Sequence, residues 1–450
     1  MRQPQSRKLL QLQALSLLLF IIALHSRLHG CSGQGEAADG SASTAAAPME
    51  EKEKRALYAA IEGFVGKGWN GSALYPDPCG WSPIQCSADA KFSPQLFDLK
   101  RLKTLSFYSC FPATNPTPIP ATSWDKLAGS LETLEFRTNP GLTGPIPASL
   151  GRLSSLQSLV LVENNLTGAV PAELGSLVRL RRLVLSGNGL SGQIPASLGN
   201  GHFAEQLLIM DVSNNSLTGS LPSSLGGLKG LLKMDLSNNL LQGSLPPELA
   251  GLGSLTLLDL RNNSFTGGLP SFLQGMASLQ DLLLSNNPLG GSLGQLGWER
   301  LRGLATLDLS NLGLVGAIPE SMAALTRLRF LALDHNRLTG DVPARLAELP
   351  NIGALYLNGN NLTGTLQFSP AFYQRMGRRF ASWDNPGLCY SNAAVDAAHA
   401  PPGVTVCKVA GGVGDGRKPE ASSSLMATSS ASNLINGFCF FLWMVATSLL

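Results

Sequence analysis

The chain is poor in charged residues, in histidine and in the motifs of enzymes. Only 14% of its 450 residues are charged, and the formal net charge is +3. A nucleic-acid-binding protein presents a strongly basic surface, so this balance argues against a nucleic-acid partner. The five histidines are scattered and no Cys-x-x-Cys pair occurs, so we expect neither a metal site nor a cofactor.

Two short glycine motifs imitate enzyme signatures, but neither lies in the required context. Residues 187–192 match Gly-x-Gly-x-x-Gly without a surrounding βαβ unit. Residues 290–294 match Gly-x-Ser-x-Gly without a strand-to-helix turn and a partnered histidine. The sequence also carries no protein kinase signature. It therefore predicts no catalytic residues and a protein that is not an enzyme.

One string of residues is repeated through most of the chain. Residues 231–252 read LLKMDLSNNLLQGSLPPELAGL, which gives the template LxxLxLxxNxLxGxLPxxLxxL. Indexed on the asparagine, the copies return every 24–27 residues, at Asn139, Asn164, Asn188, Asn215, Asn239, Asn263, Asn287, Leu312, Asn336 and Asn360. A fixed period near 24 with this pattern predicts a leucine-rich-repeat solenoid.

Each copy predicts one short strand, because its leucines alternate with outward-facing residues. The predicted fold is α/β, with a parallel β-sheet on the concave face and 3₁₀ or irregular segments on the convex side. We expect each asparagine amide to satisfy buried backbone groups of its own and the adjacent repeat. Leu312 breaks this series and predicts a local kink or a re-registered turn. The Gly-x-apolar-Pro element that follows is typical of the plant extracellular subclass.

The N-terminal part predicts export and a capped solenoid. A basic start and an apolar run indicate a signal peptide over residues 1–30, followed by a flexible leader over 31–48. Residues 49–101 form the expected N-terminal cap, with an amphipathic helix from Glu50 to Val65. Its natural disulfide is Cys79–Cys86. Cys110 occupies the asparagine slot of a degenerate first repeat and is either unpaired and buried or a competitor for Cys86.

Repeats are expected over residues 102–366 and a C-terminal cap over 367–408. This cap would contain a helix-like basic segment, Phe372 to Phe380, and a disulfide, Cys389–Cys407. Residues 409–433 read as a low-complexity linker and 434–450 as a hydrophobic tail. Small residues, a polar spacer and a terminal apolar tail favour a GPI-anchor signal over a single membrane-spanning helix. The predicted attachment residues are Ser422, Ser423 and Ser424.

The outward positions lie two, four and six residues before each indexed residue. Aspartate is the ordinary residue of this repeat class at the middle of these positions. We therefore interpret the column of aspartates as part of the repeat and not as a binding site. Departures from the template are more informative, because aromatic and exposed apolar groups mark interfaces. The candidate binding residues are Glu135, Arg137, Val160, Val162, Arg182 and Val184 near one end, and Phe330, Asp334, His335, Tyr356 and Asn358 near the other. Predicted N-glycosylation sites are Asn70, Asn165, Asn214, Asn262 and Asn361.

The stretch EEKEKRALYAAIEGFVGKGWNGSALYPDPCGWSPIQ, followed by FSPQLFDLKRLKTLSFYSCF, resembles plant leucine-rich-repeat receptor-like proteins of the Piriformospora indica-insensitive protein 2 type. The resemblance spans about residues 50–407. It implies a kinase-less cell-surface protein involved in responses to root microbes.

The repeats and the predicted export indicate extracellular recognition, and the resemblance implies a context of plant defence or symbiosis signalling. We expect a receptor-like glycoprotein on the outer face of the plasma membrane, held by its C-terminal anchor, that binds a protein, peptide or glycan ligand. Such a protein would signal through a receptor-kinase co-receptor. The first alternative is an inhibitor of secreted microbial hydrolases that resides in the cell wall, or apoplast. The second is a structural wall protein.

Overall fold

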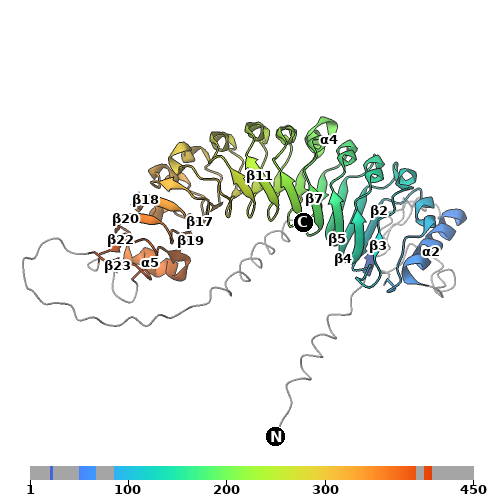
Figure 1. Cartoon of the computed structure of the whole chain (residues 1–450), viewed down its shortest axis with the longest axis horizontal. Helices are drawn as coiled ribbons and strands as arrows, with labels where there is room; N and C mark the ends of the chain where they lie inside the picture. Colours follow the sequence, from blue (N-terminus) through green and yellow to red (C-terminus); the bar gives the residue numbers. More distant parts are fainter. Residues whose placement is uncertain (1–20, 24–49, 67–85, 392–399, 408–450) are drawn as a thin grey trace, which may run out of the picture. The chain divides into compact units, whose positions relative to one another are not determined.

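The leucine repeats stack side by side as the sequence predicts. The computed structural model describes residues 21–23, 50–66, 86–391 and 400–407 of the chain. These residues lie within one unit, Met1–Cys407. In this unit the strands line the inner face of the row of repeats and short 3₁₀-helices line the outer face (Figure 1). The predicted leucine-rich-repeat solenoid is therefore confirmed.

The inner strands form one parallel sheet, which we call the ladder sheet. Successive strands pair in register, so that Met234 lies between Met210 and Leu258. All three side chains point inward and are buried, as the alternation of each strand requires. The strands of the ladder sheet are β2 (Thr104–Tyr108), β4 (Thr133–Pro145), β5 (Ser158–Ala169), β6 (Arg182–Val184), β8 (Ile209–Asp211), β10 (Lys233–Asp235), β12 (Leu257–Asp259), β14 (Asp281–Leu283), β15 (Thr306–Asp308), β17 (Phe330–Ala332), β19 (Ala354–Tyr356) and β21 (Phe380–Ala381).

A second set of strands follows the indexed residues and lies on one lateral side. These lateral strands are β3 (Thr117–Pro118), the ends of β4 and β5, β7 (Gly189–Gly192), β9 (Ser216–Gly219), β11 (Leu240–Ser244), β13 (Ser264–Thr266), β16 (Val315–Gly316), β18 (Arg337–Asp341), β20 (Asn361–Leu366), β22 (Gly387–Tyr390) and β23 (Thr405–Val406). Their pairing is interrupted between β13 and β16. Two consecutive glycines with positive φ stand at this point in both copies, 267–268 and 290–291, whereas the paired lateral strands contain at most one such glycine each.

The indexed asparagines join neighbouring repeats as predicted. Asn239 is 6% exposed, and its Nδ2 donates to the carbonyl oxygens of Val212, Leu236 and Ser237 at 3.0–3.2 Å. Its Oδ1 accepts from the backbone N–H of Leu217 at 3.0 Å. One amide thus satisfies four backbone groups that would otherwise be buried without partners.

The residue immediately before each indexed position has a left-handed backbone. Its φ lies between 50° and 75° in every copy, at Ser109, Thr138, Glu163, Gly187, Asn214, Asn238, Asn262, Asn286, Asn311, His335, Gly359 and Asp384. Asparagine tolerates this conformation better than most side chains, which explains why the middle copies read Asn-Asn.

Leu312 takes the place of the indexed asparagine without a change of register. Its side chain is 1% exposed, and Asn336 Oδ1 accepts from the backbone N–H groups of both Leu312 and Leu314. Gly290 in the preceding copy donates its N–H to the Leu312 carbonyl at 2.7 Å. The strands on both sides keep their register and Asn311 keeps the left-handed φ of its slot, so the predicted re-registered turn is wrong.

The outer face consists of short 3₁₀-helices whose leucines complete the core. They are η2 (Pro94–Asp98), η3 (Trp124–Leu127), η4 (Ala148–Arg152), η5 (Ala172–Ser176), η6 (Ala196–Gly199), η7 (Ser223–Gly227), η8 (Pro247–Gly251), η9 (Ser271–Gly275), η10 (Leu293–Gln295), η11 (Trp298–Arg300), η12 (Glu320–Ala324), η13 (Ala344–Glu348) and η14 (Gly377–Arg379). Packing between them is tight, because a Cβ at Gly226 would overlap the Glu248 carbonyl. A short helix, α4 (Gly201–Gln206), accommodates the longest interval between copies.

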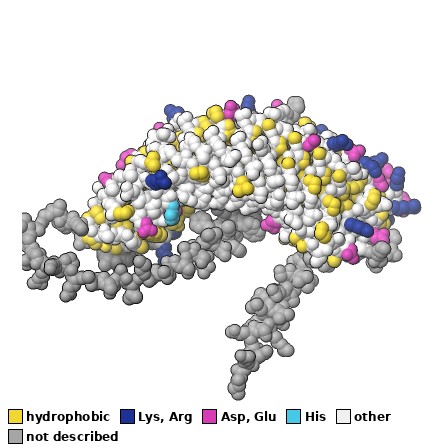
Figure 2. Space-filling model, viewed as in Figure 1, with side chains coloured by type: hydrophobic (Ala, Val, Ile, Leu, Met, Phe, Trp, Pro, Cys, Tyr) yellow, Lys and Arg dark blue, Asp and Glu magenta, His cyan; other side chains and the backbone are white. Residues whose placement is uncertain are grey.

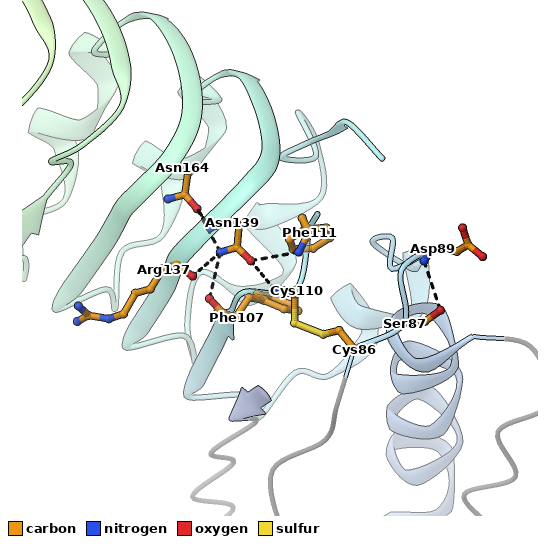
Figure 3. The surroundings of a disulfide bond; sticks show 9 residues. All are labelled: Cys86, Ser87, Asp89, Phe107, Cys110, Phe111, Arg137, Asn139 and Asn164. Atoms are coloured by element: carbon orange, nitrogen blue, oxygen red, sulfur yellow. Dashed lines mark hydrogen bonds between the residues drawn. A yellow bond between two sulfur atoms is a disulfide. The ribbon is translucent and has the colours of Figure 1, made fainter. Parts of the chain in front are cut away.

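The N-terminal cap differs from the predicted pairing. Helix α2 (Glu51–Val65) forms where expected and buries Leu57, Ile61 and Phe64. The structure joins Cys86 to Cys110, with Cα atoms 5.2 Å apart, so the predicted Cys79–Cys86 bond is wrong (Figure 3). Cys110 is buried in the asparagine slot, and the bond ties the segment after α2 to the first repeat. Cys79 itself lies outside the described residues.

The C-terminal end contains one more repeat than the sequence analysis assigned. Helix α5 (Pro370–Met376) and η14 precede strand β21, where one helical segment was predicted. Asn385 then donates Nδ2 to the carbonyls of Leu357 and Ser382 at 3.0 Å, and its Oδ1 accepts from Leu362 N–H. These are the bonds of an indexed asparagine. The predicted disulfide Cys389–Cys407 is confirmed.

A three-residue strand, β1 (Ile21–Ala23), pairs antiparallel with β2 and falls inside the expected signal peptide. In the part of the chain that the structure describes, no helix is long and apolar enough to cross a membrane.

Candidate functional site

The outward face of the ladder sheet brings the candidate residues into columns. The register places Glu135 beside Val160, Val160 beside Val184, and Val184 beside Asp211. Residues at equal distance from their indexed positions are therefore true neighbours, as the solenoid predicts. The residues of this face differ between the N-terminal, middle and C-terminal repeats.

The N-terminal part is less open than the sequence suggests. Val160 and Val184 are only 0% and 5% exposed, so the expectation of exposed valines is wrong for both. Each lies between strands about 4.8 Å away, where longer neighbouring side chains cover a small β-branched residue. Val162 is half-buried. Glu135 and Arg137 form an ion pair with Nε and Oε2 3.2 Å apart, so the two candidate charges satisfy each other.

Arg182 is half-buried beside this pair. Burial lowers the pKa of its guanidinium, and the charge of Arg137 lowers it further, whereas Glu135 and Asp211 oppose the shift. Its Nε has no hydrogen-bond partner among the described residues. The N-terminal candidates thus form a small charged group around buried valines.

In the middle repeats the column consists of aspartates whose carboxylates accept hydrogen bonds within their own turns. Asp235 Oδ1 accepts from the N–H of Ser237 at 3.0 Å and from its hydroxyl at 2.7 Å. Asp211 makes the same pair of bonds with Ser213. Burial, then the charges of Asp259 and Asp211, raise the pKa of Asp235 to about 7. These bonds support the interpretation of the aspartates as part of the repeat.

Arg261 is a cation beside this column, two residues after Asp259. Its Nε lies 3.0 Å from Asp259 Oδ1, and its terminal nitrogen lies 2.6 Å from Oδ2, which makes a bidentate pair. Burial alone would lower the pKa of Arg261, but the bond with Asp259 raises it. The middle of the ladder sheet therefore neutralises much of its own charge.

The C-terminal part presents aromatic side chains. The rings of Phe330 on β17 and Tyr356 on β19 lie 5.7 Å apart at an angle of 57°. Their partners in register, Ala354 and Ala332, are small and leave room for the contact. Burial, then the charge of Asp334, raise the pKa of the Tyr356 hydroxyl, while Arg379 lowers it. The predicted pair of aromatics on adjacent strands is confirmed.

Polar groups flank these rings. His335 is exposed, and its Nδ1 lies 2.7 Å from Asp334 Oδ2. Burial raises the pKa of Asp334, and the bond with His335 counteracts that rise. Asn358 is only 7% exposed and its carbonyl accepts from His335 N–H, so the structure places it beneath the surface. Asp334 and His335 thus remain candidates, whereas Asn358 supports them.

Sequence analysis missed Trp383. It lies two residues before Asn385, in the outward column of the additional repeat, and is 38% exposed. Tyr356 pairs with Ala381, so Phe330 on β17, Tyr356 on β19 and Trp383, two residues beyond the end of β21, follow a diagonal. We call these three residues the aromatic diagonal. The signal was available in the sequence, because Asn-Pro-Gly-Leu at 385–388 repeats 139–142 and comes 25 residues after Asn360.

The predicted glycosylation sites within the described residues are all exposed, at Asn165, Asn214, Asn262 and Asn361. Asn70 and the predicted anchor residues Ser422, Ser423 and Ser424 lie outside the described residues. Within the described ranges no group of His, Cys, Asp and Glu side chains could hold a metal ion. On the face seen in Figure 2, charged side chains gather mainly toward the N-terminal end, and the middle repeats are largely uncharged.

Comparison with known proteins agrees with this fold. A family profile described as "Leucine rich repeat" matches residues 205–265, and a second of the same description matches 179–200. The solved structure of a TDR receptor aligns with a TM-score of 0.58 and 31% identity, over 67% of this chain and 50% of that chain. The plant peptide hormone receptor RGFR1 in complex with RGF2 aligns with a TM-score of 0.53 and 26% identity, over 67% and 56%.

The fold and its outward columns therefore define a leucine-rich-repeat protein with the architecture of plant receptor ectodomains. Among curated proteins, the chain is similar to Piriformospora indica-insensitive protein 2 of Arabidopsis thaliana. The two are 47% identical over 171 residues, which cover 32% of this chain and 40% of that protein. The matched part thus spans less than half of that relative's length.

Proposed function

We propose that this protein is an extracellular receptor-like protein that binds a protein or peptide ligand at the C-terminal end of its ladder sheet. The observation that carries the proposal is the aromatic diagonal. Aromatic side chains dominate the energetics of interfaces, and the outward positions of the copies from Asn139 to Leu312 contain no aromatic residue. RGFR1, a relative in fold, is described as a peptide hormone receptor.

The finer part of the proposal concerns signalling. The protein acts without a kinase domain of its own, is held to the outer leaflet by a lipid anchor, and passes its signal through a receptor-kinase partner. Its context is the response to root microbes, in defence or symbiosis, as the similarity to Piriformospora indica-insensitive protein 2 suggests.

Site-specific photocrosslinking tests the surface even while the ligand is unidentified. A photoreactive phenylalanine replaces Tyr356 in the full chain, and a matched variant carries it at Leu240, which is 58% exposed on a lateral strand. We expect crosslinked protein from position 356 and little from position 240. The crosslink should weaken about tenfold when Trp383→Ala is added, since such anchors contribute upwards of 1 kcal/mol. Equal labelling from both positions would contradict the proposed surface.

Attachment to the membrane is tested separately by treating intact membranes with a phosphatidylinositol-specific phospholipase. Release of the protein supports the lipid anchor, and retention supports a spanning tail. Recovery in the wall fraction without treatment favours the alternative of a wall-resident hydrolase inhibitor.

A further inference from the structure

Seven exposed arginines gather on the last repeats, outside the columns described above. They occupy the segments that lead into β15, β17 and β21, at Arg300, Arg302, Arg327, Arg329, Arg375, Arg378 and Arg379. We call this set the arginine edge. It precedes the strands of the ladder sheet, whereas the indexed asparagines and the predicted glycosylation site Asn361 follow them. Glycans attached at that site would therefore project from the opposite margin of the sheet.

Backbone contacts show that these segments are stacked neighbours. Arg329 donates its N–H to the Ala305 carbonyl, and its own carbonyl accepts from Gly353, both at 2.8 Å. The pairing of Leu355 with Phe380 then brings the segment that contains Arg378 beside Gly353. Since neighbouring strands lie about 4.8 Å apart, the four segments fit within a width of about 15 Å. The arginines thus form one patch.

The patch retains its hydrogen-bond donors. Arg302 Nε donates to the Glu299 carbonyl, and Arg379 donates to the carbonyls of Met376 and Arg375. These acceptors are neutral, and no salt bridge joins any of the seven arginines to an acid within the described residues. Three acidic side chains, Glu299, Glu320 and Glu348, are exposed in the same segments, so the arginines outnumber the acids there by more than two to one. Each guanidinium has five N–H donors, so most of them face solvent.

The repeat template does not require these arginines. Two corresponding segments of the middle repeats, 253–256 and 277–280, contain only uncharged residues, and a third, 229–232, contains the single charge of Lys229. The middle and last repeats share the same backbone arrangement, so the charge is an addition to the fold. Clustered like charges cost stability, and an uncompensated cluster calls for an anionic partner.

The patch also lacks the apolar centre of a protein interface. The large hydrophobic side chains that are exposed in the described residues are Tyr108, Val178, Leu232, Leu240, Val315, Trp383 and Val406. None lies among the segments of the arginine edge, although Trp383 is in the same final repeat. Protein interfaces concentrate aromatic residues and are depleted of charge at their core. A row of arginines across stacked repeats instead matches a linear chain with regularly spaced anionic groups.

We propose that the arginine edge binds a linear polyanion, namely a carboxylated polysaccharide. Guanidinium groups bind carboxylates through two parallel hydrogen bonds, which favours arginine over lysine, and the patch contains no lysine. The choice of polysaccharide over other polyanions rests on the extracellular location in the proposed function. The edge lies beside the aromatic diagonal, so a protein held on such a polymer would still present its ligand surface.

The test uses the full-length protein and oligogalacturonate of defined length, titrated by calorimetry at low and moderate ionic strength. The variant Arg327→Gln/Arg329→Gln/Arg378→Gln is compared with Arg152→Gln/Arg181→Gln/Arg337→Gln, which removes three exposed charges outside these segments. We expect the first variant to bind at least about tenfold more weakly and to lose part of the salt dependence, since charge-assisted contacts carry the binding. The second should change affinity less than about twofold.

Thermal unfolding of both variants checks that they fold. A fully methyl-esterified oligomer of the same length should not bind, because it lacks the anionic groups. Absent binding of oligogalacturonate, or equal loss in the two variants, would overturn the proposal. Equal affinity for duplex DNA would overturn the assignment to carboxylated polysaccharide. Photocrosslinking from position 356 does not use these arginines, so failure here is distinguishable from failure of the proposed ligand surface.

Discussion

The middle repeats and the last repeats share one scaffold but use its outward face differently. In the middle, Asp211 and Asp235 bond to serines of their own turns, and Asp259 holds Arg261. Near the C-terminus the same columns carry the aromatic diagonal, whose side chains make none of these turn contacts. The comparison indicates that outward residues which form hydrogen bonds within the turn have a structural role. The aromatic residues at the outward positions of the last repeats form no such bonds, and we assign them to recognition.

The largest expected effect tests whether both regions are the same scaffold. Asn239→Ala in the middle and Asn385→Ala in the last repeat each leave several buried carbonyls and one N–H without a partner. We expect each to lower the free energy of unfolding by about 3–5 kcal/mol, measured by chemical denaturation. Gln242→Ala, at an exposed position of β11, should cost less than about 0.5 kcal/mol. A negligible effect at Asn385 would mean that its segment is a cap and not a repeat.

The second effect concerns the N-terminal end, where Cys110 replaces the asparagine. The double variant Cys86→Ser/Cys110→Ser opens a loop closed by residues 24 apart in sequence. We expect it to lose about 2–4 kcal/mol of stability, again by denaturant unfolding. Cys79→Ser is the control and should have a smaller effect. If Cys79→Ser destabilises the protein as much and Cys110→Ser alone does not, the pairing of Cys79 with Cys86 is restored.

The repetitive part of the fold was predictable because each copy repeats the same physical requirements. Leucine alternation defines the strand, and one asparagine amide satisfies backbone groups in two repeats. Ten copies in register leave little freedom, and even Leu312 is accommodated without a change of register. The predicted helix at Glu50 to Val65 and the bond Cys389–Cys407 are local features that spacing alone could indicate.

The predictions that were wrong or missing concern features that depend on neighbours in three dimensions. The partner of Cys86 could not be chosen, because two cysteines compete for it and the sequence does not show which lies closer. Exposure of Val160 and Val184 depends on the side chains of adjacent strands, which outward position alone does not describe. Trp383 was missed because its repeat lies beyond the last full copy of the template, although Asn385 marks it.

The third prediction concerns the pH dependence of stability, which we expect from the acidic column of the middle repeats and not from the aromatic region. The raised pKa of Asp235, about 7 against about 3.9 for an unfolded aspartate, means that the folded chain binds more protons between these values. Stability associated with this group therefore falls as pH rises from about 4 to about 7. Asp235→Asn should raise the free energy of unfolding by about 1–2 kcal/mol at pH 8 and leave it unchanged near pH 4.

Thermal unfolding across this pH range measures the effect, with the exposed Asp89→Asn as control. The amide can still accept from Ser237, so the turn is retained. A pH-independent gain in Asp235→Asn would show that the acidic column carries no strain, and that the middle and last repeats differ less than proposed.

The smallest expected effect concerns the residue with left-handed φ that precedes the indexed position, compared between the middle and the last repeats. Asn286 and His335 both have left-handed φ, 58° and 55°, immediately before their indexed positions. Glycine adopts this conformation without steric cost, whereas alanine costs about 1 kcal/mol. Asn286→Gly should therefore change stability by less than about 0.5 kcal/mol, and Asn286→Ala should lower it by about 1 kcal/mol.

His335→Gly should be equally neutral for stability, because its exposed ring contributes one surface contact with Asp334. If the last repeats recognise a ligand, this variant should still weaken crosslinking from position 356, whereas Asn286→Gly should not. Both stability and crosslinking are read on the same pair of variants. A loss of crosslinking in both variants, or in neither variant, would remove the distinction between a turn residue in the middle repeats and a recognition residue near the C-terminus.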